Sequence, residues 1–330
     1  MIDNKVRRAA RFLIVAFMSA MVFASAQEAI RVAFVPQLVG IPYFNAMEEG
    51  GNAAAERFGV TFIYTGPTDT NPTDQLRIVN SLIDQGVDAI SLAVLDASGI
   101  DPLVDRANER GLVLFTSDSD APDSRRAVFV AQASDEGLGF GLIDELVAQI
   151  GGSGKIGIVS GEATATNLNT WISFMQARVE ERYPDVELLE PRFAGGTAQR
   201  AFQIADDLMT AHPDLKGLIA VASTTCPGVG QAIESAGRIG EVIGTGYCSP
   251  NTARSYIKSG AFGFSVLWDP AELGYLTVWA GLQLANGDGF QAVNEVPGID
   301  RPIEYFEDTG VLLLGPAAIF DIDNVDDFDF

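Results

Sequence analysis

Residues 30–44, IRVAFVPQLVGIPYF, decide the fold of this 330-residue chain. A β-branched run at 31–35 gives way to a polar loop, and Tyr43 and Phe44 then open a helical stretch. In an open parallel α/β sheet, ligands collect where strands end, because loops and helix N-termini supply hydrogen-bond donors and apolar surface there. Gln37, Tyr43 and Phe44 are therefore the first candidates for ligand contacts.

The same alternation of strand and helix continues along the chain, which predicts an α/β fold with parallel βαβ units. The helical stretches of the first half end at Gly59, Gly86 and Gly111, as helix C-termini often do. The expected strands are RVAFV (31–35), VTFIY (60–64), DAISLAV (88–94) and VLFT (113–116), then KIGIVS (155–160), VELLEPRF (186–193), LKGLIAV (215–221), EVIGTG (241–246) and FGFSVL (262–267). Two doubly wound parallel-sheet lobes in tandem are the expected architecture.

The expected domain boundaries follow from this rhythm. The first lobe takes residues 27–131 plus about 269–298, because the helix from Pro270 has no evident partner in the second lobe. The second lobe takes residues 132–268 plus about 299–330. The chain then crosses between the lobes more than once, so a multi-strand hinge that closes on a small molecule is expected.

The N-terminus reads as a secretory signal peptide over residues 1–26. Four basic residues precede the apolar run 12–23, and Ala24-Ser25-Ala26 supplies a small-residue site, so cleavage is expected after Ala26. A retained N-terminal anchor is the alternative. The apolar run is shorter than the roughly 20 residues of a membrane span, so we expect an exported protein with no stable membrane insertion.

Charge excludes one class of partner. Loss of residues 1–26 changes the formal net charge from -23 to -26. Nucleic acid is bound by releasing counterions to Lys and Arg, and this chain has few of them and many carboxylates, so we expect no nucleic-acid partner.

The sequence holds two cysteines and one histidine. Cys226 and Cys248 follow two strands at equivalent joins, so they form a disulfide if those strands are neighbours, and remain small buried thiols otherwise. A single histidine, His212, disfavours histidine catalysis and polyhistidine metal sites. We expect no catalytic residue, no metal and no cofactor.

Polar residues at other strand ends complete the candidate site. TSDSD at 116–120 follows the fourth strand, and we expect one of Asp118 and Asp120 to face the cleft while the other caps the loop. Asn167 either caps a helix or offers its amide to a ligand hydroxyl, with Leu168 as an apolar neighbour. Trp268, where the chain returns between lobes, either packs or joins Tyr43 and Phe44 around a sugar ring.

Three other segments do not match the ligand-binding motifs that they partly resemble. The loop after the first strand lacks the G-x-G-x-x-G spacing of a dinucleotide site. GGSGK at 151–155 precedes a strand and has Ile156 where a phosphate loop has Ser or Thr. The acidic tail DIDNVDDFDF at 321–330 lacks the central Gly and final Glu of a calcium loop.

Several of these motifs together resemble one family over nearly the whole mature length. They are VPQLVGIPYF (35–44), YTGPT (64–68), TSDSD (116–120), TNLNTW (166–171), TGYCSPN (245–251) and LWDP (267–270). The chain resembles the periplasmic type I sugar-binding proteins of ABC importers, most closely the autoinducer-2-binding (Lsr-type) and rhamnose-binding receptors. The resemblance implies a monomer in the periplasm that delivers a ligand to importer permease subunits.

The resemblance also implies site residues. Gln37 stands where Lsr-type receptors have a ligand-binding lysine, and Asp118 stands where they have a first-lobe aspartate. Asn167 and Leu168 replace an Asp-Gln pair. Backbone contacts are expected near Pro227 and Val229. Since a cation, an anion and an amide are lost, a neutral pentose, deoxyhexose or short polyol fits these positions better than autoinducer-2 itself.

Two other functions compete with that of a solute receptor. An enzyme acting on a small carbohydrate would use the carboxylates of Asp118 and Asp120, but no base, nucleophile pair or metal set accompanies them. A sugar sensor is the other alternative, either for a membrane signalling partner or as a transcription regulator. The export signal and the absence of an N-terminal helix-turn-helix disfavour the regulator.

Overall fold

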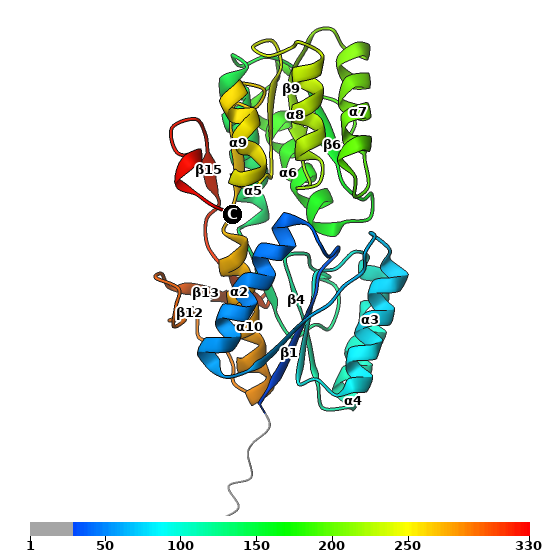
Figure 1. Ribbon diagram of the computed structural model, residues 1–330, viewed down its shortest axis with the longest axis vertical. Helices are drawn as coiled ribbons and strands as arrows, with labels where there is room; N and C mark the ends of the chain where they lie inside the picture. The colour runs from blue at the N-terminus through cyan, green and yellow to red at the C-terminus, as the bar shows by residue number, and fades with distance from the viewer. Residues whose placement is uncertain (1–28) are drawn as a thin grey trace, which may run out of the picture.

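The computed structural model describes residues 29–330, which form two α/β lobes stacked end to end (Figure 1). The expected signal peptide 1–26 and its cleavage after Ala26 lie outside the described residues. Across residues 29–330 we find no helix that is both long and apolar enough to cross a membrane.

An eight-stranded sheet forms the centre of the first lobe, in the order β12-β13-β14-β5-β4-β3-β1-β2. The strands are β1 (Arg31–Val35), β2 (Thr61–Tyr64), β3 (Ala89–Leu92), β4 (Val113–Ser117), β5 (Phe129–Ala131), β12 (Val293–Asn294), β13 (Ile303–Phe306) and β14 (Val311–Leu313). Neighbours from β2 to β14 run parallel, and β13 and β12 are antiparallel. The carboxyl ends of β1, β3 and β4 therefore meet at one edge.

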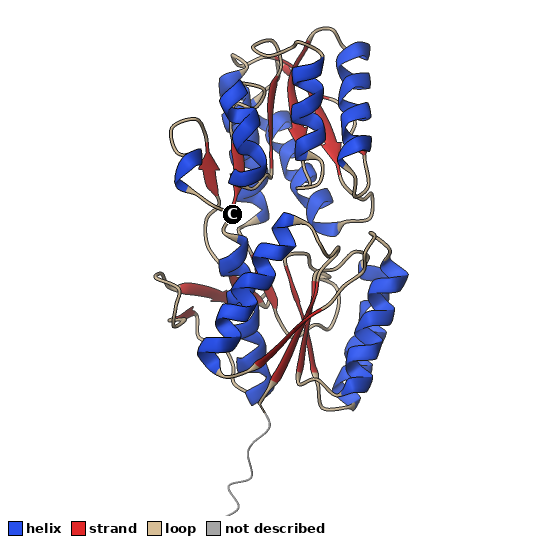
Figure 2. Ribbon diagram, in the orientation of Figure 1, coloured by secondary structure: helices blue, strands red, loops and turns tan. Residues whose placement is uncertain are grey.

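Helices cover both faces of this sheet (Figure 2). They are α2 (Pro42–Phe58), α3 (Pro72–Gln85), α4 (Ile100–Glu109) and α10 (Pro270–Asn286), with a short 3₁₀ turn η1 (Ala97–Gly99). Successive residues of β1 point to opposite faces, so Val32 and Phe34 join one buried cluster while Ala33 and Val35 join the other. Because the strand is buried on both faces from residue 32 onward, 32–35 has no polar residue, and only the first residue, Arg31, is charged.

Helices α2 and α10 lie side by side although they come from opposite ends of the chain (Figure 1). Glycines permit their close approach: a Cβ on Gly50 would lie 1.7 Å from the carbonyl oxygen of Ala271, and one on Gly274 would lie 2.0 Å from that of Met47. The pair holds the start of α2, with Tyr43 and Phe44, against the start of α10, just after Trp268.

The second lobe has a five-stranded parallel sheet of order β10-β9-β6-β7, with β8 also paired to β6. Its strands are β6 (Gly154–Ser160), β7 (Val186–Leu188), β8 (Arg192–Phe193), β9 (Leu215–Ala220) and β10 (Ile243–Gly246), and its helices are α5 (Asp135–Gln149), α6 (Thr166–Arg182), α7 (Ala198–Ala211), α8 (Cys226–Ser235) and α9 (Pro250–Ser259). The expected single strand at 186–193 is split into β7 and β8. Pro191 lies in the break, where it has no N–H for the ladder.

Three chain crossings join the lobes. The first runs from β5 to α5, the second from β11 (Ser265–Leu267) to α10, and the third from β14 to β15 (Ala318–Phe320), where β15 pairs antiparallel with β11. The expected α/β fold of two doubly wound lobes with a multi-strand hinge is confirmed. The chain ends after a 3₁₀ turn, η2 (Val325–Asp327), beside α9.

The expected boundary near residue 298 is wrong for one segment. We expected residues 299–330 in the second lobe, but β13 and β14 extend the sheet of the first lobe, with β14 parallel to β5. Only after β14 does the chain leave for β15. Backbone hydrogen bonds to the exposed edge of β5 determine this placement, and hydrophobic periodicity carries no information about which strand edge remains free.

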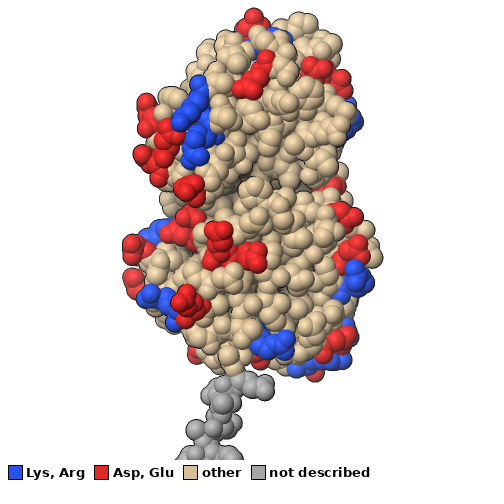
Figure 3. Space-filling model, viewed as in Figure 1, with Lys and Arg blue, Asp and Glu red and all other residues tan. Residues whose placement is uncertain are grey.

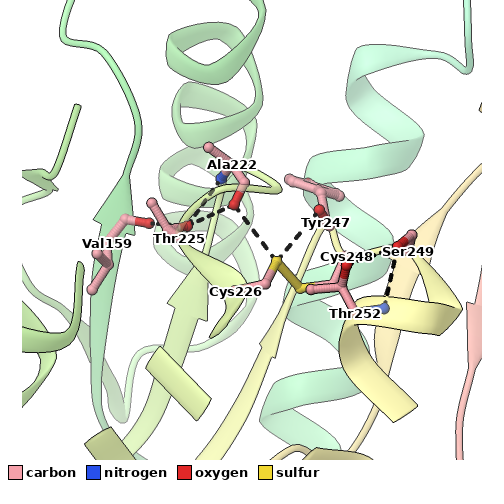
Figure 4. Close-up of a disulfide and its surroundings, with 8 residues drawn as sticks. All are labelled: Val159, Ala222, Thr225, Cys226, Tyr247, Cys248, Ser249 and Thr252. Atoms are coloured by element: carbon pink, nitrogen blue, oxygen red, sulfur yellow. Dashed lines mark hydrogen bonds between the residues drawn. A yellow bond between two sulfur atoms is a disulfide. The ribbon is translucent and has the colours of Figure 1, made fainter. Parts of the chain in front are cut away.

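One disulfide joins the second lobe's two strand-to-helix joins (Figure 4). Cys226 begins α8 and Cys248 follows β10, and their Cα atoms lie 6.0 Å apart. Because β9 and β10 are neighbours in the sheet, the condition for the bridge is met, and the alternative of two free thiols is wrong.

Candidate ligand-binding site

A cavity lies between the lobes, and the empty space in and around it, open solvent included, is about 650 Å³. Seven of the residues expected in the site line it, and they come from both lobes and the hinge. These are Gln37, Tyr43, Phe44, Asp118, Asn167, Leu168 and Trp268. Six of them follow strands that end at the edge of a lobe's sheet facing the other lobe, and Trp268 follows β11 in the hinge.

Asp118 is the most unusual residue of this cavity. It directly follows β4 and has φ 67°, which makes it the one non-glycine residue with positive φ in the described range 29–330. Asp tolerates this left-handed conformation better than most residues, yet it is still strained. Strain of this kind is often found at functional sites, where it fixes the direction of a side chain.

Burial decides the chemistry of the Asp118 carboxyl. The residue is 3% exposed, and burial raises its pKa to about 7, while a hydrogen bond from Tyr43 acts in the opposite direction. Tyr43 Oη donates to Asp118 Oδ1 over 2.5 Å. No side chain or backbone group of residues 29–330 donates to Oδ2, so this oxygen is free to accept from a ligand.

Trp268 extends this arrangement to the hinge. Its Nε1 donates to Tyr43 Oη over 3.0 Å, and the two rings meet edge to face with centroids 5.9 Å apart. Burial, and then the carboxylate of Asp118, raise the pKa of Tyr43 well above its usual value, so the phenol keeps the proton that it donates. The chain Trp268–Tyr43–Asp118 therefore fixes the carboxylate before any ligand enters.

Two amide side chains offer further hydrogen-bonding atoms. Gln37 Nε2 donates to the carbonyl oxygen of Val94 over 2.9 Å, which leaves Gln37 Oε1 as an acceptor. Asn167 Oδ1 is buried and has no partner among the described residues. A buried acceptor without a partner costs free energy, so a ligand hydroxyl that donates to Asn167 would be bound favourably.

Aromatic rings form much of the remaining wall. Trp171 contacts both Tyr247 and Trp268, with centroids 4.7 and 5.8 Å apart, and Tyr43 contacts Phe44 at 5.0 Å. Trp171 Nε1 donates to Asp135 Oδ1 over 2.7 Å, which fixes the indole, and burial raises the pKa of that carboxyl. Flat apolar faces beside a few directed polar groups suit the mixed surface of a sugar ring.

Thr70, Glu162, Trp171 and Tyr247 are among the residues that line the cavity and that the sequence analysis missed. Thr70 of the first lobe donates its hydroxyl to Glu162 of the second, so the lobes touch across the cavity. Trp171 and Tyr247 lie within the quoted segments TNLNTW and TGYCSPN, and Tyr247 directly follows β10. Because ligands collect where strands end, the position of Tyr247 directly after a predicted strand could have made it a candidate site residue.

Two expected site residues do not line the cavity. Pro227 and Val229 belong to α8, which carries them away from the strand end, and Val229 is fully buried. The residues after β9 that do line the cavity are Val221, Ala222, Ser223 and Thr224. The backbone that reaches the cavity after β9 therefore precedes Pro227 by a few residues.

The two carboxylates of TSDSD have separate surroundings. Asp120 pairs with Arg126 at 2.6 Å and accepts from Thr116, so it fixes the loop, while Asp118 lines the cavity. No Lys, Arg or His lines the cavity within the described part of the chain. In the same part, no cluster of three or more His, Cys, Asp or Glu side chains is arranged to hold a metal.

A model of the periplasmic binding protein domain matches residues 32–289 of the chain. The chain belongs to the periplasmic binding protein family. Among solved structures, this periplasmic binding protein is similar to LsrB from Clostridium saccharobutylicum in complex with AI-2. The TM-score is 0.85 at 26% identity, over 91% of this chain and 100% of that one.

Two other relatives of this periplasmic binding protein have sugars in their names. An ABC transporter solute-binding protein from Clostridium phytofermentas with bound L-rhamnose has a TM-score of 0.85 at 26% identity, over 91% of this chain and 98% of that one. The D-ribose/D-allose-binding protein of Pseudomonas aeruginosa is 26% identical over 249 residues, which are 72% of this chain and 77% of that protein. The resemblance to autoinducer-2-binding and rhamnose-binding receptors is confirmed.

Proposed function

We propose that this protein is a periplasmic receptor that binds a small neutral sugar or polyol between its lobes and delivers it to an ABC importer. Its membership of the periplasmic binding protein family supports the receptor class. The relatives named for AI-2, L-rhamnose, D-ribose and D-allose support a small polyhydroxylated ligand.

One observation carries this proposal: the cavity has hydrogen-bond acceptors that lack a donor, and aromatic side chains line the surface around them. Asp118 is oriented by Tyr43 and keeps Oδ2 free, while Asn167 Oδ1 has no partner. A ligand with several hydroxyl donors satisfies both residues at once, and its carbon-bound hydrogens pack on the rings. In its ionised form, the Asp118 carboxylate makes hydrogen bonds roughly twice as strong as those of a neutral acceptor.

The charge of the cavity narrows the ligand class. Asp118 and Glu162 are its only acidic residues, and no basic residue lines it within the described range. An anionic ligand would meet carboxylates without a compensating cation, so sugar acids and sugar phosphates are disfavoured. A pentose, a deoxyhexose, a short polyol or an autoinducer-2-like compound remains.

Gln37 separates these neutral candidates. Gln37 lines the cavity and donates its amide nitrogen to the carbonyl oxygen of Val94, so its side chain offers a neutral acceptor oxygen rather than a positive charge. A ligand that relies on a cation at this position loses that contact, and one that presents a hydroxyl gains a hydrogen bond. We therefore place pentoses and deoxyhexoses before autoinducer-2 as ligands.

A thermal-shift screen of the mature protein tests the proposal, because a ligand that binds only the folded state raises the melting temperature. The panel holds aldopentoses, deoxyhexoses, polyols, autoinducer-2 and the matching uronic acids. We expect at least one neutral compound to raise the midpoint in proportion to the logarithm of its concentration, and the uronic acids to have no effect. If turnover of a sugar accompanied binding, the protein would be an enzyme and not a receptor.

A further inference from the structure

A groove on the outside of the second lobe is separate from the cavity. It runs between α7 and the segment at β8, and it contains Arg192, Phe193, Arg200, Ile204 and Leu208. Arg200, Ile204 and Leu208 are spaced by four residues, so they form one stripe along α7. We call Arg192, Phe193 and Arg200 the basic groove surface.

The arginines of this surface lack acidic partners. The other basic residues of the second lobe, apart from Lys216, form ion pairs: Lys155, Arg178, Arg182, Arg238, Arg254 and Lys258. No carboxylate of residues 29–330 pairs with Arg192, and the guanidinium of Arg200 donates only to the neutral Gln203. The chain has 44 Asp and Glu residues and only 21 Lys and Arg residues. Two arginines without an ion pair in one groove therefore favour an external acidic partner.

Apolar surface accompanies the positive charge. Phe193 is 42% exposed, and Ile204 and Leu208 line the same groove. β8 pairs only with β6, so its outer edge is free. Aromatic and arginine side chains together are typical of the residues that dominate protein interfaces. A partner that fits has acidic side chains beside at least one apolar side chain.

The position of the groove relates it to closure of the lobes. Phe193 lies two residues before Gly195 and Gly196, which line the ligand cavity. A Cβ on Gly196 would lie 3.4 Å from Thr70 Cγ2 and 3.7 Å from Leu38 Cδ2, both in the first lobe. The strand that carries Arg192 and Phe193 therefore continues directly into the segment that touches the opposite lobe, so closure sets where this surface lies relative to the first lobe.

We infer that the basic groove surface docks an acidic, partly apolar segment of the importer's membrane subunits, an inference that rests on the proposed receptor function. A receptor with a formal charge of -26 after removal of residues 1–26 is repelled by an acidic partner unless a local positive surface faces it. Arg192 and Arg200 supply that surface, and Phe193 supplies apolar contact at its centre. Asp207, further along α7, limits the acidic contact to the end of the groove near the cavity.

Charge reversal tests the inference. The variant Arg192→Glu/Arg200→Glu is compared with Lys216→Glu, which reverses an unpaired basic residue of the same lobe outside the groove. With the sugar found in the screen, we expect both variants to bind within twofold of the unsubstituted protein. In nanodiscs that hold the importer, the double variant should stimulate ATP hydrolysis at least tenfold less, and Lys216→Glu less than twofold below normal.

Photo-crosslinking identifies the occupant. Phe193→p-benzoylphenylalanine, loaded with sugar and mixed with the nanodiscs, should crosslink to a membrane subunit, and the yield should fall as salt is raised. A crosslink only to a second receptor copy, or no crosslink with normal stimulation by the double variant, overturns the inference. If the unsubstituted protein bound no sugar at all, the proposed function would be contradicted instead. Failure of the docking inference and failure of the receptor function are therefore distinguishable.

Discussion

Asp118 concentrates the recognition chemistry of the cavity in one side chain. Its backbone strain, its burial and the hydrogen bond from Tyr43 all fix the carboxylate before ligand arrives. We expect Asp118→Ala to weaken sugar binding by about 2 kcal/mol, or roughly 30-fold, because ligand hydroxyls lose an ionised acceptor. Titration calorimetry measures the change. Asp123→Ala, an exposed residue of the same loop, is the control and should bind normally.

The titration of Asp118 predicts how affinity depends on pH. Burial raises its pKa to about 7 in the folded protein without ligand. Since ligand hydroxyls require the ionised acceptor, affinity should be constant above about pH 8 and fall roughly tenfold per unit below pH 7. Calorimetry from pH 5 to 9 checks this. Asp118→Asn should bind more weakly, with a flatter profile, and an unchanged slope in that variant would assign the dependence to another group.

Folding stability should respond to pH in the opposite direction. The folded protein binds the proton of Asp118 more tightly than the unfolded chain, whose carboxyl has a pKa of about 4. Its stabilising contribution is therefore present below about pH 4 and is lost as pH rises to 7. The difference in unfolding free energy between the unsubstituted protein and Asp118→Asn isolates this effect from Asp135 and Asp269, whose pKa values burial also raises.

At the residue scale, the sequence predicted which polar residues lie at strand ends. It did not predict which of these side chains face the cavity. Asp118 and Asn167 follow strands, and both line the cavity. Nothing in TSDSD determined which aspartate turns inward, because that depends on Arg126, which pairs with Asp120 from a later loop. Thr70 and Glu162 meet only when the lobes come together, so no local pattern marks either one.

At the scale of elements, two glycines decide the separation of α2 and α10. We expect Gly274→Ala to destabilise the protein by about 1–3 kcal/mol, because the added methyl would overlap the carbonyl oxygen of Met47 in the neighbouring helix. Gly141→Ala on α5 is the matched control. No atom lies within 4 Å of its new methyl, so this variant should be neutral or more stable by up to about 1 kcal/mol. Urea unfolding measures both.

The disulfide is a second feature that stabilises the arrangement of the elements. It connects the loops after β9 and β10 across 22 residues of sequence (Figure 4). Loop-closure entropy gives a stabilisation of about 3 kcal/mol for a loop of this size. Cys226→Ala/Cys248→Ala should lower the free energy of unfolding by about that amount without a reductant. If the double variant unfolded at the same urea concentration, the bridge would have no part in stability.

Strand pairing set the limit of prediction at this scale. The β/α alternation predicted both lobes, and the proximity of Cys226 and Cys248 followed once β9 and β10 were neighbours. The pairing of β13 and β14 with the first sheet could not be predicted from the β/α alternation. Short strands pair with whichever sheet edge has free hydrogen-bonding groups, and hydrophobic periodicity does not show which edge that is. Pro191 lies in the break between β7 and β8, where the hydrophobic pattern had predicted one continuous strand.

At the scale of the whole molecule, acidic residues lie on both lobes of the face drawn in Figure 3, and a hydrogen bond from Thr70 to Glu162 connects the lobes across the cavity. We expect Thr70→Val to raise the dissociation constant for sugar about threefold to tenfold by favouring the open form. Small-angle scattering with ligand should then find a larger radius of gyration. Thr61→Val, an exposed control on β2, should change neither value.

The central claim is that a neutral sugar binds between the lobes. Calorimetric titration of the mature protein with L-rhamnose, D-ribose, D-allose and autoinducer-2, and with a uronic acid as the anionic control, tests it most directly. The account predicts one-to-one binding of at least one neutral compound, a large loss of affinity in Asp118→Ala and no heat with the uronic acid. Tight binding of the uronic acid, or sugar binding that Asp118→Ala leaves unchanged, would contradict the account.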